Sequence, residues 1–425
     1  MLKTKLQVRR QSVLLGAPVQ LVAAVTICVA LPFMLQTWSL PLGWHEPEAQ
    51  LTAMASLIGL LLGYLLHSSV SGLPGTRESS GILPSYLISF GLVLTIILMA
   101  RIDYSRSLLI LGFVLTIFWF YLVYLVTQRQ TTLVLGVVEG GRVELLRNLH
   151  GVVALRLELD DEPVGLDAVC ADFRFPHSDA WEARLADYVL RGISVYHAKD
   201  LYESLTGRTD LEHLSENTFG ALAPLTPFQN AKRVIDFLTA LPVAVILSPL
   251  LLIVAVAIRV DSSGPALFRQ ERIGFRGQPF TVYKFRTMRI DEELEVGHER
   301  ERFMTRASDR RITRLGRFLR TSRIDELPQI FNILRGEMSW IGPRPEASPL
   351  SEWYKAEIPF YRYRHVVVPG ITGWAQVSQG HVAELHDVKT KLQYDFFYIR
   401  NFSVWLDLLI ITKTIKIMMT GYGSK

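Results

Sequence analysis

The 425-residue sequence is poor in cysteine: Cys28 lies in an apolar run and Cys170 in a predicted strand. Two cysteines form neither a disulfide framework nor a cysteine-based zinc site, so both thiols are expected to be packing residues. We find no internal repeat, no low-complexity tract and no signal peptide with a small-residue cleavage site. The formal net charge is only +5, and no nucleic-acid partner is expected.

Apolar sequence is abundant, because 49% of the residues are hydrophobic. Four runs approach the ~20 residues that a membrane-spanning helix needs, at 14–37, 51–67, 82–100 and 108–127. Lys3, Lys5, Arg9 and Arg10 precede the first run, and such a basic terminus stays in the cytoplasm. Four crossings then return the chain to the cytoplasm near Gln128. A soluble helical core is the alternative interpretation.

Residues 131–225 differ in character from the apolar runs. Strands are predicted at 133–138, 152–157, 166–173 and 193–196, with a helix at 179–191. Alternating strands and helices predict a small parallel α/β module, followed by a linker over 203–230. Its glycines do not complete a dinucleotide-binding fingerprint, so we expect a structural or regulatory module without chemistry.

A fifth apolar run, 237–258, would be ~33 Å long as a straight helix. It contains Pro242 and the pair Ser248–Pro249, and basic residues flank it on both sides: Lys232, Arg233, Arg259, Arg269, Arg272 and Arg276. Basic flanks predict that both ends are cytoplasmic, with a proline break at Ser248 and Pro249 that turns the segment back. The alternative is an ordinary fifth span.

Two adjacent carboxylates, Asp325 and Glu326, lie among clustered arginines, nine of them between Arg300 and Arg323. Pro328 predicts a helix that begins near it and ends at Gly336, which places both acids just before a helix N-terminus. That end favours ionised carboxylates and bound phosphate. The pattern indicates metal-assisted phosphate chemistry; a capped surface helix with ordinary ion pairs is the alternative.

The surrounding residues supply further candidates for phosphate binding. Residues 264–288 read as short strands that expose Gln270, Arg272, Lys284 and Arg286, and residues 309–320 as a helix with a basic face. Arg344 lies between two prolines that hold it extended, as a phosphate hook needs. The turn 369–374 ends in Trp374, which could stack on a base or simply be packed. Residues 402–419 predict an amphipathic helix on the membrane surface.

Taken together, an ordered set of motifs resembles the polyprenyl-phosphate glycosyl-1-phosphate transferases, that is, the monotopic phosphoglycosyl transferases among the bacterial sugar transferases. The motifs are Lys232-Arg-x-x-Asp236, the proline-broken run, 264–274, 283–288, Asp325-Glu-Leu-Pro-Gln329, Gly342-Pro-Arg-Pro-Glu346, 369–374 and Asp395-x-x-Tyr398 with Trp405 and Asp407. The match covers about 230–420. The four N-terminal spans and the α/β module resemble the large subclass of that family.

The resemblance implies transfer of a sugar 1-phosphate from a UDP-sugar to undecaprenyl phosphate, releasing UMP, as the initiating step of exopolysaccharide, capsule or O-antigen synthesis. It makes Asp325 the nucleophile that carries a covalent phosphosugar, and Glu326 either the Mg²⁺ ligand or a catalytic residue that assists it. By the same resemblance, Arg320 and Arg344 would hold phosphates, and Lys284 and Arg286 would line the site. Gln329 is a further candidate for substrate binding. Two positions depart from the family pattern: Arg323 stands before the dyad, and Val368 stands where a basic residue often precedes the turn.

The expected architecture is a four-helix transmembrane bundle (1–130), a small Rossmann-like cytoplasmic domain with its linker (131–225), and a monotopic α+β catalytic domain (226–425). The last has a re-entrant helix-break-helix at 237–258 and amphipathic surface helices. We expect the protein to lie in the bacterial inner membrane, with its catalytic domain on the cytoplasmic face in contact with membrane lipid. A homodimer is possible. Two rivals stand: a glycosyltransferase that moves the sugar without its phosphate, and a non-catalytic membrane scaffold.

Overall fold

The computed structural model describes residues 17–38, 47–71, 78–128, 133–149, 151–209, 226–289, 311–379 and 385–420. The chain divides into two compact units, Met1–Gly207 and Arg208–Lys425. The basic N-terminus, most of the predicted linker and the arginines from 300 to 310 lie outside the described residues. The boundaries of the three predicted domains therefore stay predictions.

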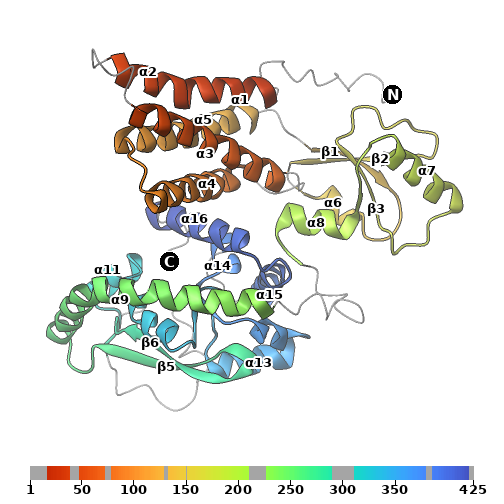
Figure 1. Cartoon of the computed structure of the whole chain (residues 1–425). Helices are drawn as coiled ribbons and strands as arrows, with labels where there is room; N and C mark the ends of the chain where they lie inside the picture. The colour runs from red at the N-terminus through yellow and green to blue at the C-terminus, as the bar shows by residue number, and fades with distance from the viewer. Residues whose placement is uncertain are drawn as a thin grey trace. The chain divides into compact units, whose positions relative to one another are not determined.

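Long apolar helices form the first part of the first unit (Figure 1). They are α1 (Ala17–Val25), the π-helical turn η3 (Thr26–Ala30), α2 (Leu31–Trp38), α3 (Pro47–Ser71), α4 (Glu78–Ala100) and α5 (Arg106–Gln128). Four stretches in them are long and apolar enough to cross a membrane, as the sequence predicts. Helices α3 and α4 pack closely because Gly63 has no side chain: a Cβ there would lie 2.3 Å from the Tyr86 ring.

A four-stranded parallel sheet forms the rest of the first unit, in the order β2-β1-β3-β4. The strands are β1 (Leu133–Val138), β2 (Val152–Leu157), β3 (Ala168–Ala171) and β4 (Val195–His197), and the helices are α6 (Glu144–Arg147), α7 (Asp179–Leu190) and α8 (Ala198–Thr206). Helices α6 and α8 pack on one face of the sheet and α7 on the other. The predicted parallel sheet is confirmed, but α8 occupies the start of the predicted linker.

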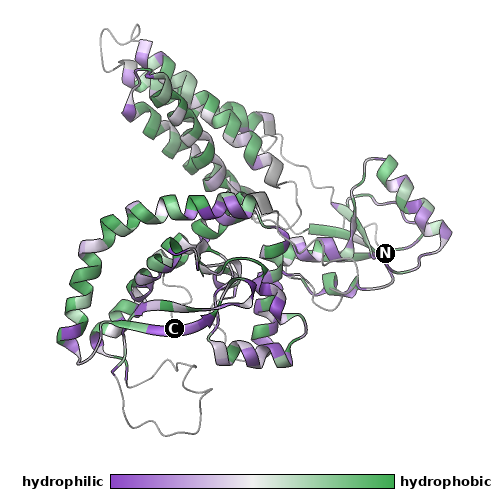
Figure 2. Ribbon diagram, turned by 60° about the horizontal axis from the view of Figure 1, so that its bottom comes forward, coloured by the Kyte–Doolittle hydropathy of each residue, from purple (hydrophilic) through white to green (hydrophobic). Residues whose placement is uncertain are grey.

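Helix α9 (Thr226–Asp261) opens the second unit and includes both Pro242 and Pro249. Figure 2 shows it bent rather than straight. Its first arm packs through Ala240 against Val282 and Ile330, whereas its second arm packs through Val254 and Ile258 against Phe285 and Leu319. The predicted break is therefore a bend within one continuous helix, with the two arms packed on neighbouring parts of the same unit. Prolines in a helix interior account for such a bend.

The rest of the second unit consists of short elements around a β-hairpin. Strand β5 (Leu267–Ile273) pairs antiparallel with β6 (Pro279–Phe285) across η6 (Phe275–Gly277), and β7 (Ser339–Ile341) pairs parallel with β8 (Gly370–Thr372). The helices are α11 (Arg314–Thr321), η7 (Ile324–Gln329), α12 (Ile330–Leu334), α13 (Ser348–Glu357), η8 (Tyr361–Val366), α14 (Trp374–Ser378), α15 (Leu385–Arg400) and α16 (Val404–Thr420).

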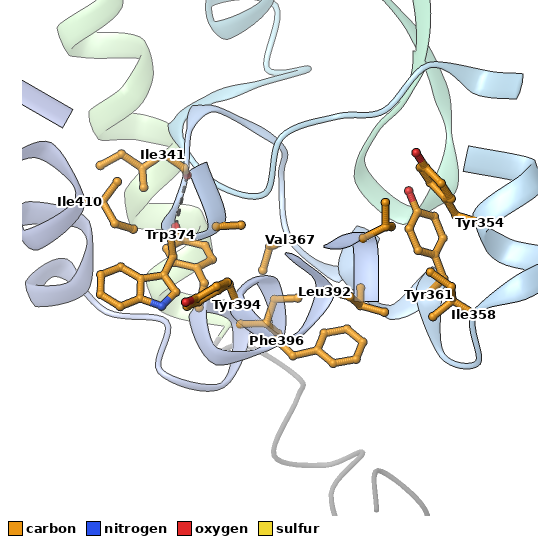
Figure 3. Close-up of a cluster of buried hydrophobic side chains, with 14 of the residues drawn as sticks. Ile341, Tyr354, Ile358, Tyr361, Val367, Trp374, Leu392, Tyr394, Phe396 and Ile410 are labelled. Atoms are coloured by element: carbon orange, nitrogen blue, oxygen red, sulfur yellow. Dashed lines mark hydrogen bonds between the residues drawn. The ribbon is translucent and has the colours of Figure 1, made fainter. Parts of the chain in front are cut away.

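An aromatic core holds this second unit together (Figure 3). Trp374 belongs to it: the side chain is only 8% exposed, and its ring stacks on Phe397 with centroids 5.8 Å apart. Trp374 is therefore packed in the core, and the base-stacking alternative is wrong. Helix α16 covers the stretch predicted as amphipathic, and its Asp407 pairs with Lys232 of α9 at 2.6 Å.

Candidate active site

The two adjacent acids lie within a helical turn, not in front of one. The 3-10 helix η7 begins at Ile324, so Asp325 and Glu326 occupy its first turn, and it runs through Pro328 into α12. Arg323, which caps η7, has a left-handed backbone with φ 59°. The predicted start near Pro328 is thus too late, because a 3-10 turn precedes the proline. The predicted stop is confirmed, since Gly336 has φ +73°.

Glu326 is held by two cationic side chains from different elements. Lys284 on β6 places Nζ 3.0 Å from Oε1 of Glu326. Arg344 approaches the same carboxylate with both terminal nitrogens, Nη2 at 2.5 Å from Oε1 and Nη1 at 3.3 Å from Oε2. Burial alone would raise the pKa of Glu326, but Arg344 and Lys284 hold it well below its usual value. Glu326 is therefore a fixed negative charge between two cations.

Asp325 is nearly buried, at 9% exposure, and its environment is different. Its Oδ1 has no hydrogen-bond partner within the part of the chain that the structure describes. Burial and the neighbouring charge of Glu326 raise the pKa of Asp325, while Lys284, Arg344 and Arg320 act in the opposite direction. A buried carboxylate oxygen that no donor satisfies is uncommon and points to a functional site.

The site contains several cationic side chains, and burial disfavours the charged form of two of them. Burial lowers the pKa of Lys284 to about 8, an effect opposed by Glu326 and reinforced by Arg344 and Arg272. Burial and Arg344 also lower the pKa of Arg272 to about 10. Cations held close together in a dry site are stabilised by any added negative charge, so this cluster is suited to bind phosphate groups.

The loop that carries Arg344 is fixed through its backbone. Arg364 Nη2 donates to the carbonyl of Arg344 at 2.8 Å, and Arg272 Nη1 donates to the carbonyl of Pro345 at 2.5 Å. Arg364 is itself buried and forms an ion pair with the buried Asp395 at 2.9 Å. The sequence analysis assigned no role to Arg364. The only feature that could have indicated it is the motif containing Asp395, because a buried aspartate needs a cationic partner.

Glycines allow the same loop to approach the 369–374 turn. A Cβ on Gly370 would lie 2.1 Å from the backbone nitrogen of Gly342, and a Cβ on Gly373 would lie 2.2 Å from the carbonyl oxygen of Gly342. No side chain fits in such a gap. The two glycine-containing motifs are therefore parts of one tight backbone contact that supports Arg344 from behind.

The remaining predicted residues do not all lie at the dyad. Arg320 Nε donates to Thr287 Oγ1 at 2.8 Å, and the charge of Arg320 acts on Asp325. Arg286 points instead to Ser262, donating to its carbonyl at 2.6 Å. Gln329 is buried, and its Nε2 lacks a hydrogen-bond partner among the described residues. Ser248 Oγ bonds the carbonyl of Val245 within α9, so Ser248 and Pro249 belong to the bend and not to the dyad.

Comparison with known proteins agrees with this arrangement. The family model described as bacterial sugar transferase matches residues 228–421. A UDP-N-acetylgalactosamine-undecaprenyl-phosphate N-acetylgalactosaminephosphotransferase from Aeromonas hydrophila is 37% identical over 425 residues, covering 98% of this chain and 97% of that protein. The chain belongs to the bacterial sugar transferase family. Membership makes it a transferase enzyme.

Two further relatives match a smaller part of the chain. A UDP-glucose:undecaprenyl-phosphate glucose-1-phosphate transferase from Xanthomonas campestris is 46% identical over 189 residues, 44% of this chain and 38% of that protein. One of the same name from Caulobacter vibrioides is 40% identical over 203 residues, 47% of this chain and 74% of that protein. The relatives therefore include enzymes named for two different sugars.

Proposed function

We propose that this enzyme transfers a sugar 1-phosphate from a UDP-sugar to undecaprenyl phosphate, releasing UMP, through a covalent phosphosugar on Asp325. The names of the relatives support the two substrates. The observation that carries the covalent step is the contrast within the dyad: Glu326 is locked by two cations, whereas Oδ1 of the adjacent Asp325 has no partner among the described residues.

In the first half-reaction an oxygen of Asp325 attacks the phosphorus that bears the sugar. The bond from this phosphorus to the bridging oxygen of UMP breaks, and UMP leaves with that electron pair. In the second half-reaction a phosphate oxygen of undecaprenyl phosphate attacks the same phosphorus and displaces Asp325, which is restored. One nucleophile thus divides a difficult transfer into two displacements at phosphorus.

The surrounding cations make the approach of a carboxylate to a diphosphate feasible. Lys284 and Arg344 lie beside the dyad, and Arg320 acts on Asp325 from α11. One guanidinium group can bind two phosphate oxygens at once, and its charge offsets the repulsion between the carboxylate and the diphosphate. The backbone contacts of Arg364 and Arg272 keep Arg344 in position before substrate arrives.

The residues fit Mg²⁺ as a partner of the substrate phosphates rather than as a protein-only site. Among the residues that the structure describes, no three His, Cys, Asp or Glu side chains gather around one point. Two adjacent carboxylates are nevertheless present, and Mg²⁺ is commonly bound by one or two carboxylates plus phosphate oxygens. Glu326 would hold it, and a bound Mg²⁺ would neutralise charge on the diphosphate.

A bent α9 supports an active site on the cytoplasmic side, where UDP-sugars occur. Both arms of α9 pack on the same unit as the dyad, so the segment is proposed to enter the membrane and return. Single cysteines at 130 and 262, in a Cys28- and Cys170-free background, test this in cells. Both should resist an impermeant periplasmic reagent; labelling at 262 but not at 130 would make α9 a span.

Donor-only incubation tests the covalent mechanism directly. The purified protein is mixed with Mg²⁺ and a panel that includes UDP-N-acetylgalactosamine and UDP-glucose, without lipid, and its intact mass is recorded. We expect one sugar-phosphate adduct, mapped to Asp325, and a stoichiometric burst of UMP. A UDP product would favour the rival that moves the sugar alone. No adduct, together with kinetics that require both substrates bound at once, would contradict the covalent step.

A further inference from the structure

A cavity of about 800 Å³ opens between the second arm of α9 and the hairpin strand β5. One wall is apolar, formed by side chains that include Leu252, Val256 and Phe268, all largely exposed. Three arginines, Arg259, Arg269 and Arg286, line the same cavity. The described lining contains no acidic side chain to balance these charges. The cavity therefore combines a surface for a hydrocarbon chain with a concentration of positive charge.

Arg286 is the buried member of the three, at 7% exposure. Its Nη2 is anchored on the carbonyl and hydroxyl of Ser262, at 2.6 and 3.0 Å. Its Nε and Nη1 are buried without a hydrogen-bond partner in the described part of the chain. A buried guanidinium with two unsatisfied donors is costly unless something accepts from them, and an anion does so best.

The cavity connects to the dyad through packed and hydrogen-bonded residues. Phe285, which precedes Arg286, packs in one cluster with Val254 of α9 and with Ile324, the residue before Asp325. Thr287, which follows Arg286, accepts a hydrogen bond from Arg320, whose charge acts on Asp325. The cavity is thus linked to the nucleophile through these neighbouring residues, and its lining does not include Lys284 or Arg344, which hold Glu326.

We infer that this cavity binds the acceptor lipid, undecaprenyl phosphate. Its phosphate binds Arg286, Arg259 and Arg269. Its first isoprenoid units pack against Leu252, Val256 and Phe268. The inference rests on the proposed function. Opposite charge and an apolar wall on the predicted membrane-entering helix select a lipid phosphate. A nucleotide, which has no hydrocarbon chain, gains nothing from that wall. Donor and acceptor phosphates then occupy different arginine sets on either side of the dyad.

Filling the cavity is the sharpest test, because the chain offers a matched control. Val256 lines the cavity, whereas Ile253 lies on the same arm with its side chain 65% exposed and does not line it. Val256→Trp and Ile253→Trp therefore place the same large side chain on the same helix, at one position that lines the cavity and at one that does not. Arg259→Gln and Arg269→Gln remove the accessible charges, and Arg362→Gln removes an exposed arginine away from the cavity.

Each variant is assayed in nanodiscs for the donor half-reaction and for full turnover against undecaprenyl phosphate concentration. Loss of a charge-assisted contact to phosphate should raise the KM for undecaprenyl phosphate about tenfold in each arginine variant. Val256→Trp should raise it at least as much. All should keep the donor-only UMP burst and adduct, and Ile253→Trp and Arg362→Gln should match wild type in both assays.

The outcomes separate this inference from the proposed function. Absence of the donor-only adduct in wild type, together with kinetics that require both substrates bound at once, would contradict the covalent step of the proposed function, whatever the cavity variants do. A wild-type adduct with unchanged KM in Val256→Trp, Arg259→Gln and Arg269→Gln would overturn the acceptor site alone. The same would follow if these variants only weakened binding to anionic lipid vesicles, since the cavity would then bind a general phospholipid headgroup.

Discussion

The two units each bury an aspartate beside a turn, and the two carboxylates differ in what satisfies them. Asp172, at the end of β3, accepts hydrogen bonds from the backbone nitrogens of Arg142 at 2.9 Å and Arg174 at 3.1 Å. Burial alone would raise the pKa of Asp172, but these two amides, together with the charges of His197 and Arg174, lower it. Asp325 keeps an oxygen without a partner among the described residues, and its pKa is raised.

The difference separates a structural carboxylate from the proposed nucleophile. Asp172 fills the glycine turn so closely that a Cβ on Gly141 would lie 2.3 Å from its Oδ2. A turn that binds phosphate in other α/β folds offers such amides to a ligand, whereas here the chain's own carboxylate accepts from one of them. The absence of chemistry predicted for 131–225 remains a prediction, but this contact supports it. Oδ1 of Asp325 has no donor among the described residues, which leaves this oxygen available for the proposed attack.

The largest expected effect is the loss of activity when Asp325 becomes asparagine. An amide is a far poorer nucleophile than a carboxylate, so Asp325→Asn should lower turnover at least about a thousandfold and abolish the adduct. Its melting temperature should stay near wild type, because the lost charge is not part of a satisfied network. Substantial turnover by this variant would show that Asp325 is not the nucleophile and, like Asp172, has no chemical role.

Glu326→Gln should follow, with a loss of roughly a hundredfold in kcat, because it removes both the partner of two buried cations and the proposed Mg²⁺ ligand. Excess EDTA should silence the wild type, and added Mg²⁺ should restore it. The measurement is kcat against Mg²⁺ concentration for both proteins. Full wild-type activity in EDTA would exclude the metal role while leaving the ion-pair role intact.

Asp395→Asn should act at a distance through Arg364 and the backbone of Arg344. Removing one partner of a buried ion pair costs about 3–5 kcal/mol, so unfolding should shift to lower denaturant concentration. Loosening Arg344 should also raise the KM for the UDP-sugar while the KM for undecaprenyl phosphate changes little. A pure stability loss with unchanged KM values for both substrates would reduce Arg364 to a core residue. Glu352→Gln, at an exposed ion pair with Lys355, is the control and should change neither.

The smallest effect, and the one that completes the comparison, is expected for Asp172→Asn. Weakening its hydrogen bonds from two backbone amides should destabilise the sheet by about 1–2 kcal/mol and leave the adduct and UMP release unchanged. Because the pKa of Asp172 is lowered on folding, its contribution is present above pH 3.8 and is lost as pH falls below that value. Denaturant titrations at pH 7 and pH 3.5 should show the difference shrinking. A large activity loss would show that the first unit takes part in the chemistry.

The sequence alone predicted much of the fold, because its signals are local. Unbroken apolar runs, strand–helix alternation and the stop at Gly336 depend on neighbouring residues, and each is confirmed as an element. The ordered motifs were also sufficient to predict the family, since their residue types and spacing are written in the chain. The start of η7 and the helix α8 were missed, because a 3-10 turn lacks the 3.6-residue period and α8 is only nine residues long.

Only the tertiary structure decided which side chains meet. From the sequence, Arg320 and Arg344 were expected to hold phosphates, and Lys284 and Arg286 to line the site. Folding instead pairs Lys284 and Arg344 with Glu326 and turns Arg286 toward Ser262. It also buried Trp374 and clamped Arg344 through Arg364. Such pairings depend on how β6, η7 and the 342–346 loop are placed in space. That placement follows from packing between residues distant in sequence, which no local pattern records.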